Sequence, residues 1–276
     1  MGLKDLLVHV DTDAACDSRL DVAVGLAAKH EAHLTGLHVM AWPQLPGYVE
    51  VELPRTFLDE QHRHLEDRAR QAEERFHERA RRRGIRGEWR VDSGNLIGRA
   101  KLHARYADVT VVAQGLDLVD APHDLAFLPE ELALGVGRPV LVVPRYGTFE
   151  RVGEHVLIAW NGTREATRAV HDALPLLKLA TKVTVLSIDP EHGTEPRVPG
   201  ADIALHLARH GIAAEAASTP GLDIGVGDLL LSRAADLGAD LIVMGAYGHS
   251  RVREMVLGGA TRHILQHMTV PVLMSH

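Results

Sequence analysis

The sequence contains few of the residues on which several classes of protein depend. It has one cysteine, Cys16, so a disulfide framework and a zinc site of several cysteines are excluded. Aromatic residues make up 4% of the chain and the formal net charge is −7, which argues against stacking on single-stranded nucleic acid and against neutralising its phosphates. No apolar run approaches the roughly 18 residues that cross a bilayer, and the first residues turn polar too early for a signal peptide. We therefore expect a cytoplasmic protein that binds neither nucleic acid nor membranes.

The residues that are present suit two layered domains. The chain has 276 residues, of which 46% are hydrophobic. This length fits two domains of about 140 residues. Two landmarks repeat 132 residues apart: an Ala-Asp pair that ends at Asp108 and Asp240, and a Pro-Val-Leu run that begins at Pro139 and Pro271. A duplication accounts for this shared spacing.

Each half alternates short apolar runs with helical patterns. We expect strands at 6–11, 34–40 and 109–113 in the first half and at 156–161, 183–188 and 241–245 in the second, with helices at 18–30 and 164–179. This alternation predicts βαβ units and a parallel sheet covered on both faces. The expected fold class is α/β, with two doubly wound, Rossmann-like parallel-sheet domains in tandem. We place the domains at 1–146 and 152–276, because glycines interrupt the pattern at the junction 145–154.

The first half also carries a long connection at 41–55 and a highly charged helix at about 56–83. The connection, rich in proline and glycine, could cap a ligand or be an ordinary surface loop. The helix has apolar residues at spacings of three and four, which predicts one buried stripe: Leu65, Ala69, Ala72, Phe76 and Ala80. Its many charged residues then form a solvated face.

A ligand site is expected where the first and fourth strands of the second half end, because doubly wound sheets bind ligands where the strand order reverses. The fourth strand leads into a glycine-spaced stretch with Gly245 and Gly248, then, after nine intervening residues, Gly258 and Gly259, and Thr261 beyond. Glycines allow close approach of the backbone, and the start of the helix at 259–267 would attract an anion. Spacing alone leaves open whether these residues bind phosphate or are ordinary turn and cap glycines.

The segment from Gly245 to Val272 resembles the nucleotide signature of the universal stress protein family. Its Gly-x-x-Gly, nine residues and a further Gly match the family pattern, and so do the LLVHVD strand and the LTGLHV run of the first half. With the repeat, the resemblance covers nearly the whole chain. It implies two domains of the adenine nucleotide alpha hydrolase-like type in tandem, and a site for an adenine nucleotide (ATP, with or without Mg²⁺).

Carried onto this sequence, the resemblance implies that the glycines and Thr261 surround ribose and phosphates, and that Ile188 lies near the adenine. Asn161 stands where the family has Asp, so the charge that would help to hold a metal is missing, and Gly259 stands where Ser or Thr is common, so a hydroxyl contact is missing. The predicted nucleotide-binding residues are Asn161, Gly162, Thr163, Ile188, Met244, Gly245, Tyr247, Gly248, Gly258, Gly259 and Thr261.

The first half departs further from the family pattern. Asp11 keeps the family acid, but Gln114-Gly115 is followed by no second glycine three residues later. Glu130 and Glu131 are expected where phosphates would lie, and their charge would repel a nucleotide. We therefore predict a degenerate first half that binds no ATP.

Other chemistry receives less support from the sequence. A P-loop motif is absent. The i,i+4 pairs His206–His210 and His263–His267 could share a helix face and bind a metal, although chance surface placement among 18 histidines is the better explanation. His249, Arg251 and Arg253 could contact phosphates or simply face solvent. Cys16 follows the first strand in a polar turn, and nothing nearby activates it.

Our leading hypothesis is an ATP-binding stress-response and signalling protein with little or no turnover. The absence of an evident general base, metal cage or arginine clamp motivates it. One rival is a slow ATPase or phosphotransferase that uses His249 or Thr261; another is a nucleotide-free scaffold for protein partners. The resemblance also implies that the two Pro-Val-Leu strands pair, which would join the halves as an intramolecular pseudo-dimer, and a homodimer is a further possibility.

Overall fold

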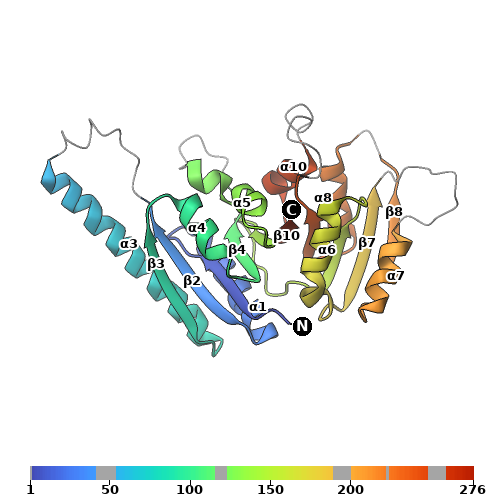
Figure 1. Cartoon of the computed structure of the whole chain (residues 1–276), viewed down its shortest axis with the longest axis horizontal. Coiled ribbons are helices and arrows are strands. Elements are labelled where there is room, and N and C mark those ends of the chain that lie inside the picture. The colour runs from blue at the N-terminus through green and yellow to red at the C-terminus, as the bar shows by residue number, and fades with distance from the viewer. Residues whose placement is uncertain (1, 42–53, 116–122, 189–199, 222–223, 248–258) are drawn as a thin grey trace.

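The computed structural model describes residues 2–41, 54–115, 123–188, 200–221, 224–247 and 259–276. The two halves have the same alternation of strands and helices (Figure 1). The first half runs through β1 (Asp5–His9), α1 (Cys16–His30), β2 (His33–Met40), α3 (Arg55–Arg82), β3 (Gly87–Ser93), α4 (Leu96–Ala104), β4 (Val109–Ala113), α5 (His123–Gly135) and β5 (Val140–Val143). The second half runs through β6 (His155–Ala159), α6 (Arg164–Leu177), β7 (Lys182–Ile188), α7 (Ala201–Arg209), β8 (Glu215–Thr219), α8 (Val226–Asp236), β9 (Leu241–Gly245), α10 (Ala260–His267) and β10 (Val272–Ser275).

The strands of the described residues form one sheet with the order β3-β2-β1-β4-β5-β10-β9-β6-β7-β8. Within each half the strands are parallel and the order reverses once, between β1 and β4 and between β6 and β9. The halves meet where β5 and β10 pair antiparallel, with Leu141 opposite Leu273. The prediction of a doubly wound parallel sheet in each half is confirmed.

Hydrophobic clusters cover both faces of this sheet. One cluster joins residues of α1, α3, α6 and α7, and the other joins residues of α4, α5, α8 and α10. Neighbouring strand residues go to opposite clusters, as Leu6 and Leu7 of β1 do, because side chains alternate along a strand. The apolar strands thus have helices on both faces, as their unbroken hydrophobicity predicts.

The repeated Ala-Asp pair has the same structural role in both halves. The Asp108 carboxylate accepts hydrogen bonds from the backbone N–H groups of Lys4 and Asp5, at the start of β1. The Asp240 carboxylate accepts them from Gly153, Glu154 and His155, at the start of β6. Each aspartate therefore ties the strand that follows it to the first strand of its half.

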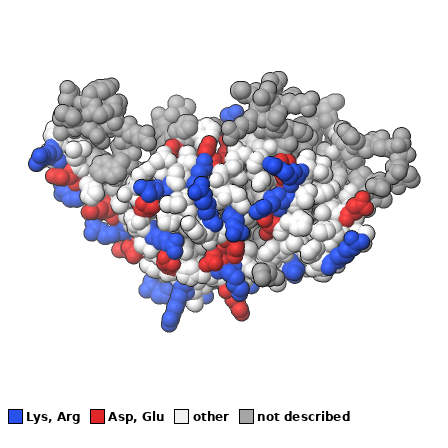
Figure 2. Space-filling model, viewed as in Figure 1, with Lys and Arg blue, Asp and Glu red and all other residues white. Residues whose placement is uncertain are grey.

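Helix α3 docks through the predicted stripe. Ala69, Ala72, Phe76 and Ala80 are buried, while Leu65 is half-buried. The Phe76 ring packs over β2 and β3, where a Cβ added to Gly36 or Gly87 would lie 2.7 Å or 2.4 Å from that ring. The rest of α3 is largely exposed, and basic and acidic side chains are interspersed on the face shown in Figure 2.

Two details differ from the expected boundaries. Helix α1 begins at Cys16, so this residue lies in the helix, fully buried, and not in a polar turn. Helix α6 ends at Leu177, two residues earlier than expected. Residues 144–154 carry neither helix nor strand, which fits the expected junction, while the domain limits 1–146 and 152–276 stay a prediction. Within the described ranges, no helix combines the length and the apolar character that crossing a bilayer requires.

Candidate functional site

The strand order of the second half reverses between β6 and β9, which pair parallel with Ile158 opposite Val243. At the carboxyl ends of these strands lie Asn161–Thr163, which lead into α6, and Ala246–Tyr247, which follow β9. This is the position at which open α/β sheets bind their ligands. The structure therefore brings together the two segments in which the sequence predicts the site.

The loop after β6 is a polar turn that begins α6. The Asn161 side-chain oxygen accepts hydrogen bonds from the Thr163 backbone N–H at 3.2 Å and from the Thr163 hydroxyl at 2.9 Å. Gly162 between them has φ 72°, which favours glycine. Thr163 is the N-cap of α6 and accepts from the Ala166 N–H. Among the described residues, the NH₂ group of Asn161 has no hydrogen-bond partner, so this exposed group can donate to a ligand.

The end of β9 lies close to the start of α6. A Cβ built on Gly245 would lie 2.6 Å from both the Ala166 nitrogen and the Glu165 carbonyl carbon, so no larger residue fits without a shift of the backbone. Beyond it, Tyr247 adopts φ 56°, a left-handed conformation that is uncommon for a residue other than glycine. The Tyr247 N–H donates to the Thr261 hydroxyl at 3.3 Å, which connects the end of β9 to α10.

Helix α10 begins beside this turn without a side-chain cap. Its N-cap is Gly259, which offers no side-chain oxygen, and the first turn contains no acidic residue. The first N–H groups of a helix have no partner within the helix, and they favour a negative charge. Thr261 is buried, and its hydroxyl accepts from Tyr247, so its role in the described structure is to position the turn.

The remaining predicted site residues have different environments. Ile188, the last residue of β7, is half-buried against the hydrophobic cluster. Met244 is 6% exposed, and its side chain belongs to the same cluster, so it offers the site its backbone only. Gly248 and Gly258 lie outside the described residues, as do His249, Arg251 and Arg253.

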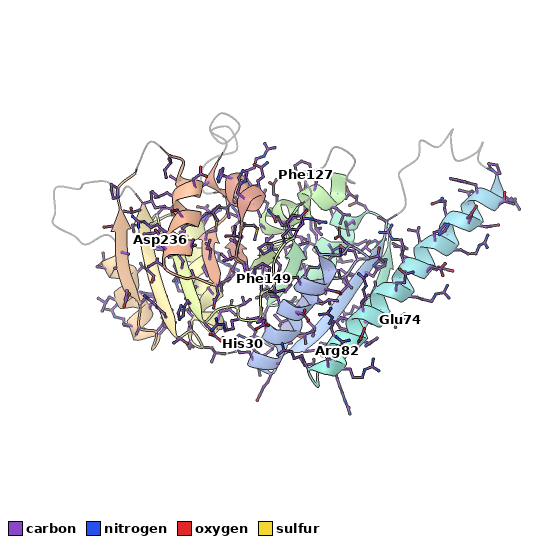
Figure 3. The ribbon with its side chains drawn as sticks, turned by 180° about the vertical axis from the view of Figure 1, so that it is seen from behind. His30, Glu74, Arg82, Phe127, Phe149 and Asp236 are labelled. Atoms are coloured by element: carbon purple, nitrogen blue, oxygen red, sulfur yellow. The ribbon has the colours of Figure 1, made fainter. Side chains whose placement is uncertain are left out.

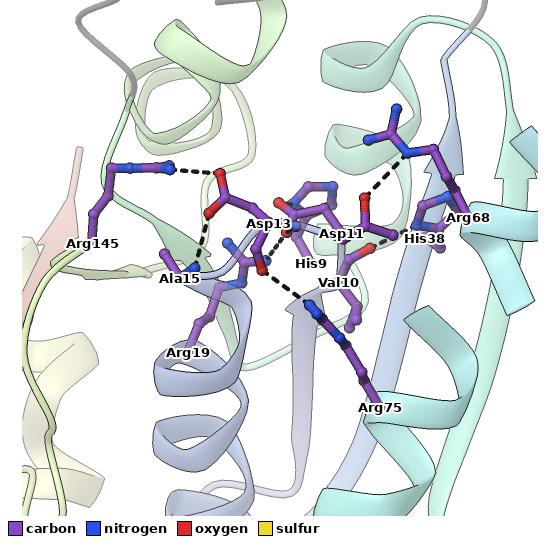
Figure 4. A network of polar contacts seen from close by, with 11 residues as sticks. His9, Val10, Asp11, Asp13, Ala15, Arg19, His38, Arg68, Arg75 and Arg145 are labelled. Carbon is purple, nitrogen blue, oxygen red and sulfur yellow. Dashed lines mark hydrogen bonds and ion pairs between the residues drawn. The ribbon is translucent and has the colours of Figure 1, made fainter. Parts of the chain in front are cut away.

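The equivalent position of the first half is filled by a buried ion pair (Figure 4). The Arg19 guanidinium lies 3.0 Å from the Asp11 carboxylate, and the Arg19 side chain is 1% exposed. His9 lies 3.8 Å from the same carboxylate. The cavity that remains here measures about 20 Å³, which is room for about one water molecule.

The charges of this cluster follow from burial and mutual contact. Burial lowers the pKa of His9 to about 4, against the opposing attraction of Asp11, so this histidine is neutral at pH 7. Burial alone would raise the pKa of Asp11, but Arg19 and His9 outweigh it and lower that pKa to about 2. Asp13 pairs with Arg145 and accepts from the Ala15 N–H, so the turn after β1 is held on several sides.

The expectation for Glu130 and Glu131 is wrong in its geometry. Neither carboxylate lies at a helix start, because α5 already begins at His123, whereas the position equivalent to the start of α10 is Leu128. Glu131 pairs with Lys101 of α4, and Glu130 lines a cavity together with Arg262 of the second half. In the first half, α5 itself occupies the corresponding space. It packs on Gly115, where a Cβ would lie 2.1 Å from the Ala126 carbonyl oxygen.

Several of these residues could not be identified from the sequence. Arg19 lies on the buried face of α1, and its helical spacing from the other buried residues was the one signal in the sequence that could have indicated its burial. The Gln114 side chain donates hydrogen bonds to carbonyl oxygens of α10 in the second half, and because this contact joins segments far apart in the sequence, no local pattern indicates it. Glu165, in the first turn of α6, is buried, and a hydrogen bond and ion pair with Arg164 help to lower its pKa despite the desolvation that opposes this.

The histidine pairs share helix faces but form no metal site in the described part of the chain. The ring centroids of His206 and His210 are 4.8 Å apart, and those of His263 and His267 are 4.4 Å apart. No group of three or more metal-ligating side chains is found among the described residues. Burial raises the pKa of the Cys16 thiol, as expected of a structural cysteine.

Comparison with known proteins finds similarity to one protein family and to its fold. The model of the Universal stress protein family matches residues 153–276. Universal stress protein Slr1230 of Synechocystis sp. is 28% identical over 156 residues, which are 52% of this chain and 49% of that protein, so the chain spans about half the length of this curated relative.

Solved structures reproduce the fold over nearly the whole chain. A universal stress protein from Archaeoglobus fulgidus DSM 4304 aligns over 98% of this chain and 96% of its own, with a TM-score of 0.76 and 15% identity. A protein of unknown function from Pseudomonas aeruginosa PAO1 aligns over 99% and 92%, with a TM-score of 0.59 and 15% identity. Residues 153–276 are therefore a domain of the universal stress protein family, within a chain that has the fold of a whole solved universal stress protein.

Proposed function

We propose that the second half binds one adenine nucleotide, ATP, at the carboxyl ends of β6 and β9, and that the chain is a stress-response and signalling protein with little or no turnover. The observation that carries this proposal is the meeting of three features at one place. The uncapped start of α10 at Gly259, the Asn161 NH₂ group and the turn at Tyr247 all lie where the strand order reverses. The family match over this half supports the choice of an adenine nucleotide.

The donors in this site suit an anion. The N–H groups of the first turn of α10 would donate hydrogen bonds to phosphate oxygens, and Gly259 has no side chain that caps them. Mg²⁺ prefers carboxylate and phosphate oxygens, and the Asn161 oxygen already accepts two hydrogen bonds. A metal that accompanied the nucleotide would therefore be held mainly by the phosphates.

The residues around the proposed site also lead us to expect slow hydrolysis of ATP. Catalysed hydrolysis needs a group that positions or deprotonates water. Among the described residues around the site, the carboxylate at the start of α6 is Glu165, which is buried and bonded to Arg164. We therefore expect binding without appreciable release of phosphate.

The first half is proposed not to bind ATP. Arg19 fills the space between β1 and α1, and the cavity of about 20 Å³ is far smaller than a nucleotide. One ATP per chain is the expected stoichiometry.

The test is calorimetric titration of nucleotide-stripped protein with ATP, with and without Mg²⁺. A Cβ on Gly259 meets no described atom within 4 Å, so Gly259→Val should fold while its side chain projects into the proposed phosphate position. We expect at least a tenfold loss of affinity in this variant. Gly25→Val on α1 is the matched control, since a Cβ there also meets no described atom within 4 Å and it lies in the other half.

Wild-type protein that binds no ATP under either condition would overturn the proposed function. Two ATP molecules per chain would overturn the proposal for the first half alone. Phosphate release that keeps pace with binding would favour an enzyme.

A further inference from the structure

The first half contains a cavity of about 660 Å³. Its lining comes from three segments: the start of α1, the end of α3, and residues 145–150, which follow β5. Phe149 lies beside α1, and α3 lies on the other side of that helix (Figure 3), so the cavity extends over α1 between these two walls. Small-molecule sites have volumes of about 300–1,000 Å³, and this cavity is within that range.

Contacts within the protein hold the walls of this cavity in place. The Ser18 hydroxyl donates to the Gly147 carbonyl oxygen at 3.0 Å, which connects the segment after β5 to α1. Arg79 of α3 lies 2.9 Å from the Asp17 carboxylate and 2.5 Å from the Asp21 carboxylate, which connects α3 to α1. The cavity is therefore formed without a ligand, and a preformed site lowers the entropic cost of binding.

Two charged groups of opposite sign on this lining have no charged partner. Arg83, the C-cap of α3, and Glu150, in the segment after β5, are exposed, and neither side chain forms an ion pair within the described ranges. The other charges are used inside the protein, Asp13 by Arg145 and the two aspartates of α1 by Arg79. The cavity thus presents one available positive group and one available negative group to a ligand.

This balance disfavours a ligand that carries only one sign of charge. Three arginines and four carboxylate side chains line the cavity. A purely anionic ligand would lie beside the carboxylates and a purely cationic one beside the guanidinium groups, and both arrangements are repulsive. A zwitterion can place each of its charges beside the available group of opposite sign.

The separation of the two available groups indicates the length of the ligand. Arg83 belongs to the α3 wall and Glu150 to the opposite wall, so α1 lies between them. A helix with its side chains is about 10–12 Å across. An extended peptide spans at most about 3.3–3.6 Å per residue, so about three residues are needed to reach from one wall to the other.

Aromatic side chains on the same lining suit the middle of such a ligand. The Tyr146 side chain is 87% exposed, so its ring is available for contact, while Phe149 is half-buried against the hydrophobic cluster under α1. An aromatic ring supplies a large contact area at a small cost in conformational entropy.

We propose that this cavity binds a short zwitterionic peptide of about three residues, with its carboxylate at Arg83 and its ammonium group at Glu150. The planar guanidinium fork of arginine matches a carboxylate, and a glutamate carboxylate accepts hydrogen bonds from an ammonium group. The site does not depend on the proposed function, because none of the predicted nucleotide-binding residues lines the cavity. It assigns the first half a ligand of its own.

The test is an NMR titration of the full chain with trialanine, read from the backbone amides. Three further peptides are compared with it: trialanine acetylated at its amino end, amidated at its carboxyl end, and blocked at both ends. Trialanine should shift the signals of the start of α1 and of residues 145–150. Each single block removes one charge and should weaken binding about three- to fivefold, as for a partly exposed ion pair.

Two variants assign the ends of the peptide. Arg83→Ala should bind trialanine about three- to fivefold more weakly and should no longer distinguish it from its amidated form. Glu150→Gln should lose the distinction from the acetylated form instead. Arg81→Ala is the matched control, because Arg81 is an exposed arginine of α3 that does not line the cavity, and it should leave every affinity within about twofold of the wild type.

The outcomes decide the proposal. It is overturned if trialanine shifts no signal at concentrations up to about 10 mM, or if the doubly blocked peptide binds as tightly as trialanine. It is also overturned if Arg83→Ala still distinguishes trialanine from its amidated form, because the carboxylate then lies elsewhere. ATP titration of the same protein reports on the proposed function separately, so failure of one proposal leaves the other standing.

Discussion

Arg19 marks the main chemical difference between the two halves. The buried positions of α1 recur 150 residues later in α6, where Ala169 stands in the place of Arg19. The partner of Arg19 changes in the same way: Asp11 in the first half corresponds to Asn161 in the second. Because an unpaired buried charge is costly, a domain that lacks the arginine has no need of the aspartate for pairing. A neutral Asn161 is thus consistent with an alanine, Ala169, in the place of the arginine.

His9, beside this ion pair, predicts a dependence of stability on pH. Its pKa is lowered by burial from 6.5 to about 4, so between these values the unfolded chain binds a proton that the folded chain does not. The free energy of unfolding should therefore fall as the pH is lowered from about 6.5 to about 4, by at most about 3 kcal/mol from this residue. The lowered pKa of Asp11 acts elsewhere: its stabilisation is present above pH 3.8 and is lost only as the pH approaches about 2.

The measurement is urea unfolding at several pH values in this window. His9→Gln should show a shallower fall than the wild type, with the remaining slope due in part to His30 and His38, whose pKa values burial also lowers. His64→Gln, an exposed substitution on α3, is the control and should keep the wild-type slope. Equal slopes for His9→Gln and the wild type would show that His9 is not the titrating group.

Gly245 shows how one residue governs the packing of two elements. In the second half, β9 ends so close to the first turn of α6 that a Cβ would lie 2.6 Å from two backbone atoms. The equivalent residue of the first half, Ala113, carries that Cβ. The two halves thus differ in the spacing between their fourth strand and their first helix. The tighter spacing occurs in the half with the proposed site.

Gly245→Ala should therefore destabilise the protein. The contact is with backbone, which cannot rotate away, so the helix or the strand must shift, and we expect a loss of about 1–3 kcal/mol in the free energy of unfolding. Ala113→Gly in the first half is the control and should cost no more than about 1 kcal/mol, the usual effect of added backbone freedom. Denaturant unfolding of both variants measures the difference. A loss for Gly245→Ala that does not exceed the loss for Ala113→Gly would contradict this account of the packing.

The elements were largely predictable, because their patterns are local. The spacing of Ala69, Ala72, Phe76 and Ala80 alone indicates the buried stripe of α3, and the run 109–113 coincides with β4. The start of α5 was not predicted from the sequence, although Pro122 directly precedes it in the sequence and Asp124 lies in its first turn, both of which are signals of a helix start. Without that boundary, the directions of Glu130 and Glu131 could not be deduced.

At the scale of the whole molecule, the order of the strands follows from the repeat, while the side-chain contacts between the two halves do not. A duplicated doubly wound domain fixes where the strand order reverses in each half, so the site could be placed between β6 and β9 from sequence. The hydrogen bonds from Gln114 to Leu265 and Gln266 depend on how segments of the two halves meet, and such contacts between distant segments leave no periodic trace in the chain.

The joint between the halves, where β5 pairs with β10, also predicts how the molecule unfolds. Three pairs of residues face each other between β5 and β10, and all are buried: Val142 and Val272, Leu141 and Leu273, Val140 and Met274. Because each terminal strand completes the sheet of the other half, loss of one half exposes the edge and the core of the other. We expect the wild type to unfold in a single cooperative transition, observed by calorimetry and by circular dichroism.

Leu273→Asp tests this coupling, because a buried carboxylate at the centre of the joint opposes pairing of β5 with β10. We expect it to separate the unfolding into two transitions, each with a smaller enthalpy than the single one. Leu205→Asp, at a position on α7 that is 54% exposed, introduces the same charge away from the joint and should leave one transition. Two transitions in the wild type would mean that the halves unfold independently, and that the strand pair contributes little to the stability of either.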